Sequence, residues 1–93
     1  MMRRANEIDG IIGANLRFYR LMREMTQEQL GLAVGLSFQQ IQKYEKALNR
    51  VAVSTLLDIS KALDIPMVLF WTERQSAQSV TLEGREAQLP DAF

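Results

Sequence analysis

The 93-residue sequence contains no cysteine and no histidine. A chain without these two residue types has no disulfide, no thiolate nucleophile, no imidazole base and none of the usual zinc ligands. Its carboxylates are scattered: Glu24 and Glu28, for example, have no paired acid, base or nucleophile. We therefore expect a protein that is not an enzyme and that uses no metal or cofactor.

Long apolar runs are also absent. The longest, residues 65–71, has seven residues, whereas a membrane-spanning helix needs about 20. Arg3 and Arg4 are followed by Glu7 and Asp9 rather than by the apolar stretch of a signal peptide. We expect a cytoplasmic protein with no membrane partner.

Composition and length are typical of a small globular protein. Hydrophobic residues make up 47% of the chain and charged residues 24%, and a chain of this length holds one domain. The formal net charge is zero, but residues 1–50 have eight Lys and Arg against five acids, and residues 51–93 have three against six. This asymmetry favours a basic face in the first half of the chain.

Apolar residues spaced three and four positions apart predict an all-α fold of five helices in one domain, residues 9–71. The apolar positions of the first are Ile8, Ile11, Ile12, Leu16 and Tyr19. The fourth is expected to begin at Ser54, and the fifth at Pro66, which suits the first turn of a helix. Residues 1–8 are expected to be a flexible arm and residues 72–93 a mostly irregular tail, with residues 80–82 typical of a short strand.

The second and third helices are separated by a very short turn. Thr26 can cap the start of the second helix, and Gly35 follows its end, where a left-handed residue commonly closes a helix. Ser37 can cap the third helix, whose expected buried stripe is Ile41, Tyr44 and Leu48. Gly31 allows the two helices to pack closely. The pattern indicates a helix-turn-helix, the motif that places an α-helix in the major groove of DNA.

The third helix is expected to turn polar side chains outward. Its leading residues are therefore candidates for reading bases: Ser37, Phe38, Gln39, Gln40 and, one turn on, Lys43. Gln can pair in two places with adenine, and Phe can meet a thymine methyl group. Groups suited to hold the phosphates are Gln27, Arg23, Asn49 and Arg50. A solvated polar helix face is the competing interpretation.

Several motifs occur in an order and spacing that resemble a known family: Leu16-Arg-Phe-Tyr-Arg20, Thr26-Gln-Glu-Gln-Leu30, Val34-Gly-Leu-Ser37, Ile41-Gln-Lys-Tyr-Glu45 and Leu56-Leu-Asp-Ile-Ser-Lys-Ala-Leu63. The chain resembles the lambda-repressor-like, Cro-type (XRE) helix-turn-helix regulators over residues 9–71. That resemblance implies a five-helix DNA-binding domain in which Gln27 holds a phosphate and Ser37, Phe38, Gln39 and Lys43 face bases. It also implies a structural ion pair between Arg20 and Glu45. The chain departs from the family at Gly31, often Ala, and at Ala47, often Gly.

The fifth helix is unusually rich in large apolar side chains, which either complete the core or form a subunit interface. We favour an interface, with Met67, Leu69, Phe70 and Trp71 as candidates. A two-fold homodimer would place two recognition helices ~34 Å apart on a palindromic operator. The expected function is a transcriptional regulator that binds double-stranded DNA and acts as a repressor.

A different class of function stays open. The same helical core could serve as an antitoxin-like or other protein-interaction module, with residues 72–93 binding a protein partner. Deleting residues 72–93 separates the two interpretations, because it should abolish such a complex and leave the affinity for DNA nearly intact.

Overall fold

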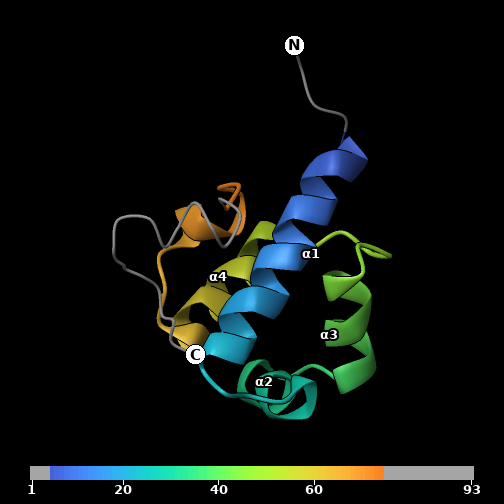
Figure 1. Cartoon of the computed structure of the whole chain (residues 1–93). Coiled ribbons are helices and arrows are strands. Elements are labelled where there is room, and N and C mark those ends of the chain that lie inside the picture. Colours follow the sequence, from blue (N-terminus) through green and yellow to red (C-terminus); the bar gives the residue numbers. More distant parts are fainter. Residues whose placement is uncertain (1–4, 75–93) are drawn as a thin grey trace.

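The computed structural model describes residues 5–74, and every regular element in that range is helical (Figure 1). The order is α1 (Ala5–Met22), α2 (Gln27–Val34), α3 (Phe38–Glu45), α4 (Val53–Leu63) and a 3-10 helix, η1 (Met67–Phe70). The prediction of an all-α fold is confirmed. Only the fifth element differs in type, because it is a four-residue 3-10 helix after Pro66 and not an α-helix.

Helix α1 begins at Ala5, four residues before the predicted start of the domain. Glu7 lies in its first turn, where a carboxylate complements the positive end of the helix. Residues 5–8, expected in a flexible arm, are therefore helical. Residues 75–93, which include the predicted strand at 80–82, lie outside the described part of the chain.

The core draws on all five elements, which pack in the pairs α1 with α3, α2 with α3, α2 with α4, and η1 with both α1 and α4. Its buried residues are Leu16, Leu30, Ile41, Tyr44, Leu56, Ile59, Leu63 and Phe70. Phe70 is 0% exposed, so its predicted place in a subunit interface is wrong. In a 3-10 helix residues three apart share a side, and Met67 packs against the core together with Phe70.

The turn between α2 and α3 has the local chemistry that the sequence predicts. Thr26 is the N-cap of α2 and accepts a hydrogen bond from the backbone N–H of Gln29, whose side chain accepts one from the Thr26 N–H in return. Gly35 closes α2 in the left-handed conformation, at φ 76°. The Ser37 hydroxyl then caps α3 by accepting from the Gln40 N–H at 3.1 Å. These three caps fix where each helix of the pair begins and ends.

The segment after α3 differs from the prediction at two residues. Leu48, expected in the buried stripe, is 69% exposed, because α3 ends at Glu45 and Ala47 adopts a left-handed conformation at φ 60° that turns the chain outward. Helix α4 begins at Val53, and its N-cap is Ala52, which has no side-chain capping bond. Ser54 is thus inside α4 and not its cap.

Candidate nucleic-acid interface

Helix α3 has two sharply different faces. Ile41 and Tyr44 are buried in the core, while the opposite side is exposed along its whole length, at Phe38, Gln39, Gln42, Lys43 and Lys46. Of the residues predicted to read bases, Ser37, Phe38, Gln39 and Lys43 are exposed and Gln40 is half-buried. The polar face of α3 is therefore open to solvent, as contact with a nucleic acid requires.

Ser37, the N-cap of α3, and Phe38, the first residue of the helix, differ in what they can offer a base. The Ser37 oxygen already accepts from the Gln40 N–H, but its hydroxyl hydrogen is still available to donate. Phe38 is 44% exposed, so part of its ring can contact an apolar group such as a thymine methyl.

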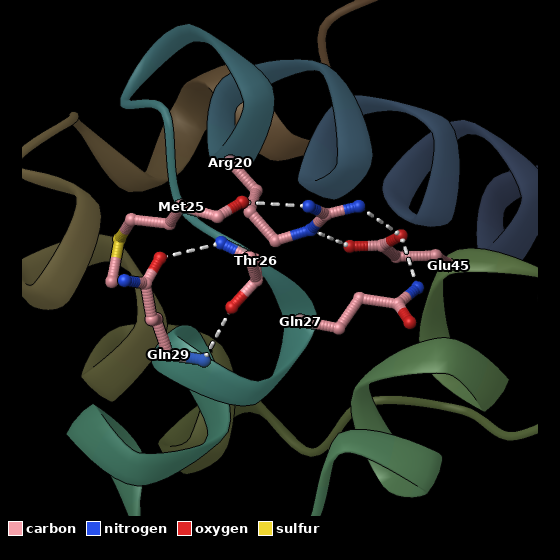
Figure 2. Close-up of polar contacts among 6 residues, drawn as sticks. All are labelled: Arg20, Met25, Thr26, Gln27, Gln29 and Glu45. Carbon is pink, nitrogen blue, oxygen red and sulfur yellow. Dashed lines mark hydrogen bonds and ion pairs between the residues drawn. The ribbon is translucent and has the colours of Figure 1, made fainter.

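Figure 2 shows an ion pair between Arg20 of α1 and Glu45 of α3. Arg20 Nε donates to Glu45 Oε2 at 2.6 Å and Arg20 Nη2 donates to Glu45 Oε1 at 3.0 Å. The side chains are only 7% and 3% exposed. A two-point pairing of this kind satisfies both charges in a dry site. The ion pair implied by the family resemblance is present.

The same pair also holds the start of α2. Arg20 Nη1 donates to the Met25 carbonyl oxygen at 2.7 Å, directly before the N-cap Thr26. Gln27, the first residue of α2, donates from Nε2 to Glu45 Oε1 at 3.0 Å. The N-terminal end of α2 is thereby fixed relative to α3.

Two glycines allow close backbone approaches. A Cβ on Gly31 would overlap the Leu36 carbonyl oxygen, so Gly31 is needed where the turn after α2 folds back on that helix, and not at a contact with α3 itself. A Cβ on Gly13 of α1 would lie 2.5 Å from the Tyr44 carbonyl oxygen and 2.7 Å from that of Glu45. Sequence reasoning missed Gly13, although a glycine within an amphipathic helix is the available clue to such a contact.

Besides Gln27, three residues were predicted to hold phosphates, and they differ in their partners. Asn49 and Arg50 are exposed in the loop after α3, and Arg50 Nε donates to the Asp9 carboxylate at 3.0 Å. Arg23 has a different partner: its guanidinium donates to the carbonyl oxygens of Leu63 and Asp64 at 2.7 and 3.0 Å. These carbonyls end α4, where a cation is favoured. The structure therefore gives Arg23 a role in joining α1 to α4.

The predicted subunit interface is only partly exposed. Trp71 is 46% exposed, Met67 and Leu69 are half-buried, and Val68, which the sequence analysis did not single out, is 52% exposed. Trp71 lines a shallow pocket of about 440 Å³ together with Ile8, Ile11, Ile12 and Glu73. A mostly apolar surface thus lies where α1 meets the end of η1.

Within residues 5–74, no group of three or more acidic residues is arranged to hold a metal ion. None of the described helices is both long and apolar enough to cross a membrane.

A family model described as Helix-turn-helix matches residues 16–70 of the chain. An uncharacterized HTH-type transcriptional regulator of Sinorhizobium medicae is 45% identical over 71 residues, covering 76% of this chain and 51% of that protein. The chain spans about half the length of the curated relatives it matches.

Two solved structures share the arrangement of helices. The restriction-modification controller protein C.AhdI from Aeromonas hydrophila has a TM-score of 0.64 and 26% identity, covering 67% of this chain and 94% of that chain. The hypothetical transcription factor NHTF from Neisseria has a TM-score of 0.71 and covers 87% of this chain and 94% of that chain. At 17% identity, the second likeness concerns the fold alone.

Proposed function

The chain belongs to the helix-turn-helix family of transcriptional regulators, and we propose that it acts as a repressor that binds a palindromic operator as a homodimer. The observation that carries the proposal is the exposed polar face of α3, with Gln39 and Lys43 directed away from the core. A helix of this kind, presented at the surface by a capped turn, fits the major groove of DNA.

We assign base reading to the first turns of α3. In this assignment Gln39 forms two hydrogen bonds with adenine, a contact that discriminates against a wrong base by about 1–3 kcal/mol. Phe38 offers an apolar edge to a thymine methyl, Ser37 a hydroxyl donor, and Lys43 a cation one turn further along the groove. Gln40, being half-buried, has the smallest share in this set.

Phosphate contacts are assigned to Gln27 at the start of α2 and to Asn49 and Arg50 after α3. These groups lie before and after the reading helix in the chain, so they would set its register on the duplex. Arg23 is left out of the set because two nitrogens of its guanidinium are bound to carbonyls at the end of α4. Arg50 is kept because only its Nε is bound, to Asp9, and its side chain is 71% exposed. The zero net charge of the chain is compatible with this scheme, because the field near the groove governs the encounter with DNA.

Dimerisation is assigned to the apolar surface around Trp71, with contributions from Met67 and Leu69. Aromatic and Met side chains are enriched at such interfaces, and Trp71 is the largest exposed apolar residue in the described part of the chain. Two copies related by a two-fold axis would present their α3 helices to half-sites one DNA turn apart, ~34 Å.

Selection from a pool of random-sequence duplexes, at two salt concentrations, tests the proposal. The wild-type protein should enrich a palindrome. Gln39→Ala should relax the preference at one base position in each half-site, whereas Arg50→Ala should weaken binding to all sequences alike and reduce the salt dependence. Lys61→Ala, an exposed cation on α4, is the matched control and should change neither property. Failure of the wild-type protein to enrich any sequence would contradict the proposal.

A further inference from the structure

Glu45 has a second hydrogen-bonding partner that a simple ion pair does not need. Its Oε1 accepts from Arg20 Nη2 and also from Gln27 Nε2, each at 3.0 Å (Figure 2). Gln27 is the first residue of α2 and Glu45 the last residue of α3. One carboxylate therefore joins the start of α2 to the end of α3, the two helices that are proposed to contact DNA.

The chemistry of a carboxylate decides which end of the Gln27 amide faces it. A carboxylate in an ion pair accepts hydrogen bonds only, so it holds the NH₂ end of the amide and repels the carbonyl end. One of the two N–H bonds on Nε2 is directed to Glu45, and the other remains free to donate. Phosphate oxygens are also acceptors only, so an N–H is the group that binds them and a carbonyl oxygen is not.

The ion pair also limits movement of this amide. Arg20 binds Glu45 in two places and holds the Met25 carbonyl, so the chain on either side of the N-cap Thr26 is tied to the same buried charges. Gln27 itself is half-buried. A side chain already fixed in its binding orientation loses less conformational freedom when it meets its ligand.

We propose that Glu45 is a positioning residue for DNA binding: it orients the Gln27 amide so that an N–H is presented to a backbone phosphate. The inference rests on the proposed function, in which Gln27 contacts a phosphate. It goes beyond a structural role for the Arg20–Glu45 pair. The contribution of Gln27 to the affinity for DNA would depend on the negative charge of Glu45, a residue that itself does not contact DNA.

A double-mutant cycle on the duplex enriched by the wild-type protein tests this dependence. Gln27→Ala should lower the affinity about tenfold, as expected for a hydrogen bond to a charged group. Glu45→Gln replaces the carboxylate with an amide that can donate as well as accept, so it no longer selects one orientation of Gln27. In that background the effect of Gln27→Ala on affinity should shrink to about fivefold or less, because an amide free to flip presents its N–H only about half of the time and is no longer fixed in place.

The matched control is Glu28→Gln, the same chemical change at an exposed position in the first turn of α2. It should leave the tenfold Gln27→Ala step intact, even if it raises the overall affinity by removing a negative charge. An equal Gln27→Ala step in the wild-type and Glu45→Gln backgrounds, or no step in the wild type, would overturn the inference. Because the wild-type protein must first bind the duplex, failure of the proposed function is a separate and visible result.

A second variant covers the case in which Glu45→Gln does not fold, since it leaves Arg20 buried beside a neutral partner. The double change Arg20→Met with Glu45→Met removes both charges and leaves none unpaired, and its folding can be checked by urea denaturation. In this background the effect of Gln27→Ala on affinity should again be smaller than in the wild type. Persistence of the full step there would contradict the inference.

Discussion

The side-chain amide of Asn15 donates a hydrogen bond of 2.7 Å to the carbonyl oxygen of Phe70, 55 residues further along the chain. The same nitrogen donates to the Thr72 carbonyl at 3.0 Å, and the Asn15 oxygen accepts from Arg74 Nε at 2.8 Å. Because Asn15 is only 2% exposed, these protein partners replace the hydrogen bonds that its amide would otherwise form with water. This one residue fastens the end of η1 and the chain beyond it to α1.

Replacing Asn15 by Ala should therefore destabilise the domain by about 1–3 kcal/mol, because the buried Phe70 carbonyl loses its side-chain donor. The measurement is the free energy of unfolding from urea denaturation monitored by circular dichroism. Asn6→Ala, at an exposed position of the same helix, is the matched control and should stay within about 0.5 kcal/mol of the wild type. Equal effects of the two variants would show that the Asn15 contacts contribute nothing to stability.

Gly31 and Gly10 should respond in opposite directions to the same substitution. Gly31→Ala puts a methyl group against the Leu36 backbone carbonyl, which cannot move aside as a side chain can, and should cost about 1–3 kcal/mol. Gly10→Ala meets nothing within 4 Å and should stabilise α1 by about 0.5–1 kcal/mol, because Ala forms helices better. Thermal unfolding of the two variants decides the point. A Gly31→Ala variant as stable as Gly10→Ala would refute the close packing.

Ala47 offers a stabilising change. At φ 60° its backbone lies in the left-handed region, which costs a residue with a Cβ roughly 1–2 kcal/mol. Replacing it by Gly removes this cost, but part of the gain is offset by the greater freedom of Gly in the unfolded chain. We expect Ala47→Gly to raise the free energy of unfolding by about 0.5–1 kcal/mol. The same change at the exposed helical residue Ala14 should lower it by about 1 kcal/mol. A loss of stability in Ala47→Gly would speak against the left-handed turn.

Tyr19 predicts a pH dependence at the alkaline end. Burial raises the pKa of its hydroxyl above the ordinary value of 10.0, and the positive charge of Arg74 opposes that rise. As the pH passes the unfolded-state pKa, the unfolded chain loses this proton first, so stability falls until the pH exceeds the higher folded-state pKa. Urea denaturation from about pH 8 to about pH 11 should show a steeper loss in the wild type than in Tyr19→Phe. Parallel curves would contradict a raised pKa at Tyr19.

Local signals in the sequence predicted the helix pair well. Thr26, Gly35 and Ser37 act within three or four residues of their partners, so the chemistry of each cap is visible in the sequence itself. The fold class followed from the spacing of apolar residues, and the Arg20–Glu45 pair followed from resemblance to a family.

The errors arose where the outcome depends on distant contacts or on backbone conformation. Leu48 continues the apolar spacing of α3, but the helix ends at Glu45. The helical periodicity therefore does not reach Leu48, and its side chain is exposed. The sequence leaves open whether Phe70 faces the core or a partner subunit. Only the packing of η1 against α1 and α4 places it in the core. Asn15 gave no signal because its partners are carbonyls and an arginine more than fifty residues away.

A nuclear magnetic resonance titration of the isotope-labelled protein with the duplex it selects tests whether α3 reads DNA. The backbone amide signals of residues 37–46 and of Gln27 should move with added DNA. Signals of Asp58 and Lys61, exposed on α4, should stay in place. Changes concentrated on α4, with residues 37–46 unaffected, would contradict the claim that α3 reads DNA.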